Sequence, residues 1–173
     1  MNLMDAIKTR NSMRDYEDKD IPDNVIEEIL NAAICAPSAG NAQDWHFVVV
    51  KNPETKKQLA EASIGQDFVA SAPVVVCVCS DLEKISRAYG ERGTNLYSVQ
   101  DTSAAIMCLM LAAWDKGLGT CWVGAFSEQD VKNILVLPTN IRPMAMITLG
   151  YPKNLVRQQK SRDLKSVLHK EHW

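Results

Sequence analysis

Residues 72–80, APVVVCVCS, are apolar at nearly every position and decide how the rest of the chain is interpreted. β-Branched side chains favour a strand. Apolar residues at successive positions, rather than at alternate ones, indicate that both faces of that strand are buried. The sequence therefore predicts a core strand here, with other elements packed on each side of it.

Strands and helices alternate on both sides of this run. Runs of β-branched and aromatic residues predict further strands at 45–51, 121–123 and 144–149. Apolar residues at helical spacing, or capping patterns, predict helices at 3–7, 22–36, 53–59, 98–116 and 127–135. The helix at 98–116 has no Gly or Pro and is apolar almost all round, which is typical of a helix buried by a core or by a partner subunit. Gly117 is expected to cap its C-terminal end. Residues 81–97, which are charged and contain two glycines, are interpreted as a surface excursion.

The composition is that of one ordinary soluble domain, residues 1–173, with 19 Lys and Arg against 21 Asp and Glu and 46% hydrophobic residues. A formal net charge of -2 makes nucleic acid or an anionic membrane surface a poor partner. The longest unbroken apolar stretch, 104–114, is far shorter than the ~20 residues of a membrane span. Residues 1–10 lack the pattern of a secretion signal, so we expect a cytoplasmic location.

The five cysteines and three histidines suggest neither a disulfide framework nor a metal centre. The cysteines are odd in number and lie among apolar neighbours, so we expect reduced, buried thiols. Neither GxGxxG nor GxxxxGK[ST] occurs, which disfavours a Rossmann dinucleotide site or a P-loop.

Two groups of cationic residues could bind an anion. Arg10, Asn11, Ser12 and Arg14 offer two guanidiniums, an amide and a hydroxyl within a short segment, which suits a terminal phosphate. Residues 151–173 carry an excess of four positive charges in a chain whose total is negative. An exposed basic loop and a frayed, solvated terminus are the alternatives.

Two loops combine glycine with groups that could contact a ligand. Residues 37–45, PSAGNAQDW, lead into a buried strand, and Asn41 and Gln43 supply amides that can read the edge of a planar, hydrogen-bonding ring. Gly124 follows a short apolar strand, where a glycine lets a ligand ring or another backbone approach closely. An ordinary turn and simple packing are the alternatives.

The order in which these pieces occur resembles the nitroreductase family of FMN-dependent oxidoreductases. The pieces are RNSMR at 10–14, PSAGNAQDWHF at 37–47, YGERG at 89–93, QD at 100–101, GLGTCWVGAF at 117–126, LGYP at 149–152 and KSR at 160–162. The likeness covers nearly the whole chain, from about residue 4 to about residue 169. It implies an α+β fold, a three-layer α/β/α sandwich around a mostly antiparallel sheet, in an intertwined homodimer with flavin sites at the interface.

The resemblance also implies FMN as the cofactor and NADH or NADPH as the co-substrate, and it assigns residues to the flavin. Arg10, Asn11, Ser12 and Arg14 would hold FMN, and Lys160 and Arg162 would close on its phosphate. Pro37, Ser38, Ala39 and Asn41 would lie against the flavin of the partner subunit, and Val123 and Gly124 beside the reactive N5. No side chain is assigned a catalytic role, because the hydride chemistry belongs to the cofactor.

The same likeness makes residues 151–173 a C-terminal extension of the single domain that contacts cofactor and partner subunit. Asp44 stands where many relatives have proline, which is expected to loosen the 37–45 loop or alter its charge.

The implied activity is reduction of nitroaromatic, quinone or flavin-type acceptors by ping-pong hydride transfer through flavin N5. The alternatives are a specialised relative acting on one metabolite, by reductive dehalogenation or flavin breakdown, a non-catalytic flavin-binding protein, and a dimeric scaffold without cofactor. The acceptor and the choice between NADH and NADPH depend on residues 81–97, where any lid over the flavin is expected to be small.

Overall fold

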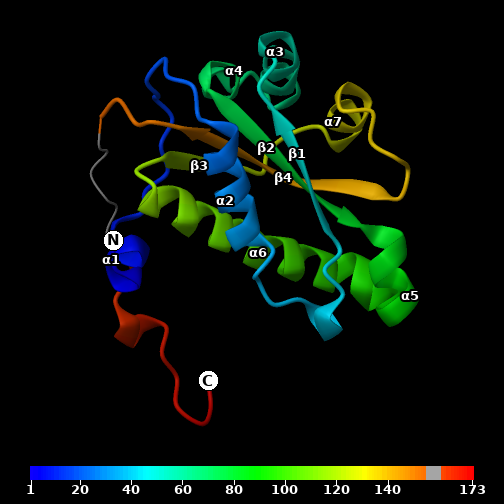
Figure 1. The fold of residues 1–173 in the computed structure, drawn as a ribbon. Helices are drawn as coiled ribbons and strands as arrows, with labels where there is room; N and C mark the ends of the chain where they lie inside the picture. Colours follow the sequence, from blue (N-terminus) through cyan, green and yellow to red (C-terminus); the bar gives the residue numbers. More distant parts are fainter. Residues whose placement is uncertain (155–160) are drawn as a thin grey trace.

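A four-stranded antiparallel sheet with helices on both faces is the centre of the computed structural model, which describes residues 1–154 and 161–173 (Figure 1). The strands lie in the order β1-β2-β4-β3. Their bounds are Trp45–Val50 for β1, Val74–Asp81 for β2, Gly119–Val123 for β3 and Ile141–Gly150 for β4. The strand predicted from residues 72–80 is therefore an inner one, paired with β1 on one side and β4 on the other.

Alternate side chains of β2 enter two different cores. Val74, Val76 and Val78 pack with α2 (Asp23–Ala33) and α6 (Ser98–Asp115). The side chains between them pack with α3 (Pro53–Ala62), α4 (Asp67–Ser71) and α7 (Glu128–Ile134). Complete burial of a valine stabilises a fold by ~1.5–3 kcal/mol, so a strand with valine on both faces fixes both helical layers. The predicted three-layer α+β arrangement is confirmed.

The capping signals in the sequence operate as expected. The Asn52 side chain caps α3 by accepting the Thr55 N–H at 3.0 Å, and Ser127 caps α7 by accepting the Asp130 N–H at 3.3 Å. Gly117 follows α6 with a φ of 76°, the left-handed conformation that glycine adopts at a helix end without strain.

Two segments differ from the sequence prediction. Helix α4 was not predicted, because a single turn has too few residues to show helical spacing. Residues 81–97 are helical rather than an irregular excursion: α5 (Leu82–Arg92) begins where the Asp81 side chain accepts the N–H groups of Glu83 and Lys84. A π-helical turn, Gly93–Tyr97, then leads directly into α6.

The helical run from Leu82 to Asp115 is long enough to cross a membrane by length and composition, with a mean hydropathy of 1.3 over an 18-residue window. Core helices of soluble proteins meet the same test. Ile106 and Leu109, in the middle of α6, are completely buried against the sheet. Packing inside the domain therefore accounts for part of the apolar character of this run, and 44% of that window is buried.

The thiols are less uniform than the sequence suggested. Cys77, Cys79 and Cys121 are buried as expected, but Cys35 is exposed and Cys108 half-buried. Cys35 comes just after the last turn of α2, at the edge of the core, where apolar sequence neighbours do not guarantee cover. All five are free, although the sulfurs of Cys77 and Cys79 are 3.7 Å apart.

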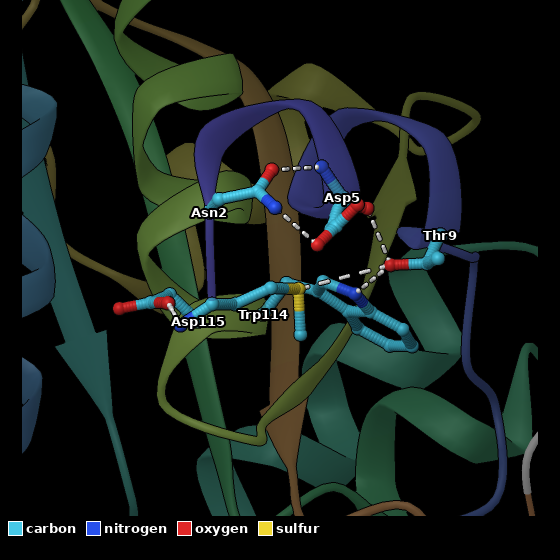
Figure 2. A network of polar contacts seen from close by, with 6 residues as sticks. Asn2, Asp5, Thr9, Trp114 and Asp115 are labelled. Atoms are coloured by element: carbon cyan, nitrogen blue, oxygen red, sulfur yellow. Dashed lines mark hydrogen bonds and ion pairs between the residues drawn. The ribbon is translucent and has the colours of Figure 1, made fainter.

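The N-terminal helix, α1 (Leu3–Thr9), is fixed to the end of α6 by polar contacts (Figure 2). The Trp114 indole N–H donates to Thr9 Oγ1 at 2.9 Å, and the N-terminal ammonium lies 2.8 Å from Asp115. Asn2 caps the helix by accepting the Asp5 N–H at 2.9 Å. These contacts set the position from which the next segment, residues 10–16, continues.

Candidate functional site

Residues 10–14 run beside β3, held by main-chain contacts. Ser12 forms a parallel bridge with Thr120, and the Met13 N–H donates to the Thr120 carbonyl at 2.8 Å. A Cβ at Gly119 would lie 2.6 Å from Met13 Cγ, so glycine is what lets this segment lie so close to the strand. Met13 is 1% exposed and anchors the segment in the core.

Two guanidinium groups gather at this segment. Arg10 Nη1 is buried without a hydrogen-bond partner, and the Arg14 guanidinium carbon lies 5.5 Å from the centre of the Phe68 ring. Burial raises the pKa of the Cys121 thiol, while the charges of Arg14 and Arg10 act to lower it, which places both cations near that sulfur. Thr120 Oγ1 is also buried without a partner.

An anion fits this arrangement. A buried N–H without a partner costs ~1–3 kcal/mol, and more when the group is charged, and protein groups or a ligand normally satisfy it. A phosphate would give Arg10 Nη1 that partner and would be held by charge-assisted hydrogen bonds. The donor set is therefore suited to a phosphate-bearing molecule lying beside β3.

The end of β3 leaves room for such a molecule. Val123 is 2% exposed, and Gly124 follows it at the surface. A Cβ at Gly124 would come no closer than 3.6 Å to Trp122 Nε1, which is an ordinary contact. Packing within the chain thus requires glycine at 119 but not at 124, so the simple packing interpretation of Gly124 loses its support.

The loop of residues 37–43 lies at the end of the molecule near α5, away from residues 10–14 (Figure 1). Its own polar groups hold it. Ser38 Oγ accepts the Gln43 N–H at 3.0 Å, and Asn41 Oδ1 accepts a hydrogen bond from Gln43 Nε2 at 2.8 Å. The Ala39 N–H donates to Asp101 Oδ1 on α6 at 2.9 Å.

Glycine is needed in this loop for two reasons. Gly40 has a φ of 52°, and an added Cβ would overlap the Tyr89 hydroxyl of α5. A hollow beside the loop is lined by Ala39, Gly40, Tyr89, Tyr97, Gln100 and Asp101. The shape of the loop thus depends on a left-handed backbone at Gly40 and on close packing against Tyr89 of α5.

The sequence profile of the nitroreductase family matches residues 7–66 and 63–151, which together span most of the chain. The chain belongs to the nitroreductase family. It is 36% identical over 181 residues to a protein of Methanothermobacter thermautotrophicus provisionally named NADH dehydrogenase/NAD(P)H nitroreductase, covering 100% of this chain and 88% of that one. It is also 33% identical to a protein of Thermus thermophilus named NADH dehydrogenase, with 85% of each chain covered.

A solved structure of a nitroreductase family protein from Streptococcus pneumoniae superimposes with a TM-score of 0.88 at 25% identity, covering 98% of this chain and 100% of that one. The agreement extends over the whole fold, so the layer arrangement described above is that of the nitroreductase family.

The residues that the nitroreductase resemblance assigned to the flavin fall into separate groups. Arg10, Asn11, Ser12 and Arg14 lie along β3, whereas the loop from Pro37 to Asn41 packs on α6. Within one chain, no contact among the described residues joins these two groups. Arg162 is exposed on the C-terminal segment, and Lys160 lies outside the described residues.

Sequence reasoning gave no role to several residues at these two places, although all but the first lie in segments quoted for the resemblance: Phe68, Asp101, Thr120 and Cys121. Only Asp101 carried a usable signal, because an acidic residue in a helix that is apolar almost all round needs a buried partner. The others come from segments distant in sequence, and no local pattern indicates that they meet.

Proposed function

We propose that this protein is an FMN-dependent NAD(P)H oxidoreductase that reduces nitroaromatic, quinone or flavin-type acceptors with ping-pong kinetics. Membership of the nitroreductase family supports the flavin and the nicotinamide co-substrate. So does the 26% identity, over 99% of this chain and 74% of its relative, to a Bacillus subtilis protein named FMN reductase [NAD(P)H]. The single observation that carries the proposal is Arg10 Nη1, buried without a hydrogen-bond partner next to the segment along β3, in a chain of this family.

The residues along β3 hold the cofactor in this proposal. Arg10 binds the FMN phosphate with its unpaired N–H, and Ser12 and Asn11 supply further polar groups. Arg14 stands over Phe68, where its charge favours a flavin that gains negative charge on reduction. Lys160 and Arg162 close on the same phosphate from the C-terminal segment.

FMN, when bound, supplies the hydride chemistry at its N5. The chain's own part is to position that atom and to leave one ring face open. Gly124 and Val123 would allow the close approach, since a Cβ at 124 is not needed for packing. The loop of Pro37, Ser38, Ala39 and Asn41 would lie against the flavin of the partner subunit. Hydrogen bonds within its own chain, to the Ser38 hydroxyl and the Asn41 amide oxygen, would hold it in shape there.

The apolar surface that a single chain exposes supports a homodimer. Leu3, Met4 and Ile7 on α1 and Met107 on α6 are each more than 40% exposed. The C-terminal segment adds the exposed side chains of Leu164, Val167, Leu168 and Trp173 and extends away from the sheet beyond α1 (Figure 1). Exposed apolar patches of this kind mark interfaces. The proposed unit is thus a dimer of two single-domain chains, in which residues 151–173 of each chain form an extension. We propose a cytoplasmic location for this dimer.

The test is the visible spectrum of the purified protein before and after anaerobic addition of NADH or NADPH, followed by steady-state turnover with a quinone. We expect a flavin band, its bleaching by a nicotinamide, and parallel double-reciprocal plots. Failure with every general acceptor while the nicotinamide still bleaches the flavin would favour the specialised relative. Bleaching by neither nicotinamide would favour a flavin-binding protein without this activity. A colourless protein that FMN does not reconstitute would refute the proposal.

A further inference from the structure

Two buried aspartates lie behind the 37–43 loop, close enough for the Asp44 side chain to interact with that of Asp101. Asp44, at the end of the loop, is completely buried, and Asp101 on α6 is 5% exposed. One oxygen of each has a partner: the Ser80 hydroxyl donates to Asp44 Oδ2, and the Ala39 N–H donates to Asp101 Oδ1. The remaining oxygens, Asp44 Oδ1 and Asp101 Oδ2, are both buried without a partner.

No ion pair among the described residues neutralises the charge of either aspartate. The titratable groups that face this region from the neighbouring elements are His46, Asp81, Lys84, Tyr89 and Tyr97. Lys84 Nζ donates to the Gln43 carbonyl at 2.9 Å, and no described residue forms an ion pair with either aspartate. Two ionised carboxylates in contact at such a place would be strongly unfavourable.

We propose that Asp44 and Asp101 share one proton between their two otherwise unpartnered oxygens, and that this proton positions the 37–43 loop on α6. A single hydrogen between Asp44 Oδ1 and Asp101 Oδ2 satisfies both atoms at once. Asp101 then holds the Ala39 N–H while Asp44 holds the end of the loop against Ser80 on β2. The loop is clamped at two points by one shared proton.

The titration of Asp101 agrees with this geometry. Burial raises the pKa of Asp101 from an ordinary 3.8 to about 6, although the Ala39 N–H acts in the opposite direction. The charge of Asp44, and the hydrogen bond that protonated Asp101 donates to it, also raise this pKa. The folded protein therefore keeps a proton that the unfolded chain loses between pH ~4 and ~6. Stability falls with rising pH over that range, and the clamp is lost as the pH passes through about 6.

From the sequence, Asp44 was expected to loosen the loop or to alter its charge, and this clamp is the opposite of the first effect. The carboxylate is buried and bonded to β2, so at low pH it fixes the loop rather than freeing it. For FMN the consequence, which rests on the proposed function, is that the loop lying against the flavin is best ordered below neutral pH.

Asp44→Asn tests the shared proton, because its amide places a permanent hydrogen between the two residues and still accepts from Ser80. We expect wild type and variant to have similar Tm at pH 5. At pH 7.5 we expect the variant to melt ~5 °C higher, since only wild type has lost its proton. Asp67→Asn, which removes an exposed aspartate from α4, should follow wild type at both pH values. If Asp44→Asn does not fold, Asp101→Asn offers the same substitution and retains an acceptor for Ala39.

A second measurement reports on the loop itself. The hydrogen-exchange protection factor of the Ala39 amide should fall ~10-fold from pH 5 to pH 7.5 in wild type and stay constant in Asp44→Asn. The same pH dependence in both proteins, or none in wild type, would overturn the shared proton.

Both measurements are made on the protein as purified and again with saturating FMN. If they fail while FMN binds, the clamp is wrong and the proposed function stands. If they succeed while FMN does not bind, the clamp is right and the proposed function is wrong.

Discussion

The resemblance assigns residues 10–14 to the flavin of their own chain and the 37–43 loop to the flavin of the partner subunit, and the two are built in opposite ways. The first presents guanidinium groups, and one of their N–H groups is buried without a partner. The second satisfies its side-chain amides and hydroxyl internally and is backed by two acidic residues. The first is organised to bind a charged group, whereas the second is organised to keep a shape.

This difference predicts which of the two regions contributes to ligand affinity and which contributes to the shape of the site. A charged donor without a partner gains a strong hydrogen bond when an anion arrives, so residues 10–14 should dominate affinity. A loop whose groups are already satisfied gains little from a ligand, so residues 37–43 should act by fit and by their own stability. Substitutions in the two regions should therefore have different signatures.

Arg10→Ala should have the largest effect, a ~100-fold loss of FMN affinity, because it removes a charge-assisted bond worth ~2–3 kcal/mol. Riboflavin lacks the phosphate, so its affinity should change less than threefold. Titration calorimetry with both ligands measures this. Lys8→Ala, which removes an exposed cation from α1, is the control and should alter neither affinity appreciably. Equal losses for FMN and riboflavin would show that Arg10 does not contact the phosphate.

Gly40→Ala should come next and should act on stability. The left-handed φ of 52° and the overlap with the Tyr89 hydroxyl together should cost ~2–3 kcal/mol of unfolding free energy. Gly65→Ala is a matched control, since Gly65 has a φ of 69° and no atom within 4 Å of an added Cβ. Its cost should be ~1 kcal/mol, from backbone conformation alone.

Urea unfolding of both variants, and of Gly40→Ala combined with Tyr89→Phe, separates the two contributions. The double variant should recover part of the loss. If the Gly40 and Gly65 variants lose the same stability, the loop does not depend on packing against α5.

Arg14→Ala should have a smaller effect on affinity, ~10-fold, because this guanidinium lies over Phe68 with more solvent access. It should also lower the midpoint potential of the bound flavin, since a cation favours the more negative reduced form. Arg14→Lys keeps the charge and should retain most of the potential. Anaerobic redox titration with saturating FMN decides this: an unchanged potential in Arg14→Ala would remove Arg14 from the flavin's surroundings.

The sequence predicted the layers well because their causes are local. Apolar residues at successive positions of β2, the cap at Ser127 and the glycine after α6 each act within a few residues. The helical nature of residues 82–97 was missed because charged residues and Gly90 obscure the pattern, although Asp81 caps the helix.

For the candidate site, the sequence predicted which chain segments take part but not which residues surround them. Arg10 and Arg14 were expected to bind an anion, but the surroundings that make Arg10 special come from β3, and those of Arg14 from α4. Likewise, the contact of Asp44 with Asp101 joins positions far apart in the chain. No local spacing encodes such contacts, because they depend on how the layers pack.

The smallest effect is expected at the contact that fixes residues 10–14 from outside the site. Thr9→Val keeps the shape of the side chain but leaves the Trp114 indole N–H without its acceptor at the end of α6 (Figure 2). The unfolding free energy should fall by ~1 kcal/mol, and FMN affinity by about threefold, because Arg10 follows directly and loses part of its fixed position. Thr139→Val, at an exposed turn, is the control for adding an apolar side chain. A loss of stability without any loss of affinity would mean that the main-chain contacts to Thr120 position Arg10 by themselves.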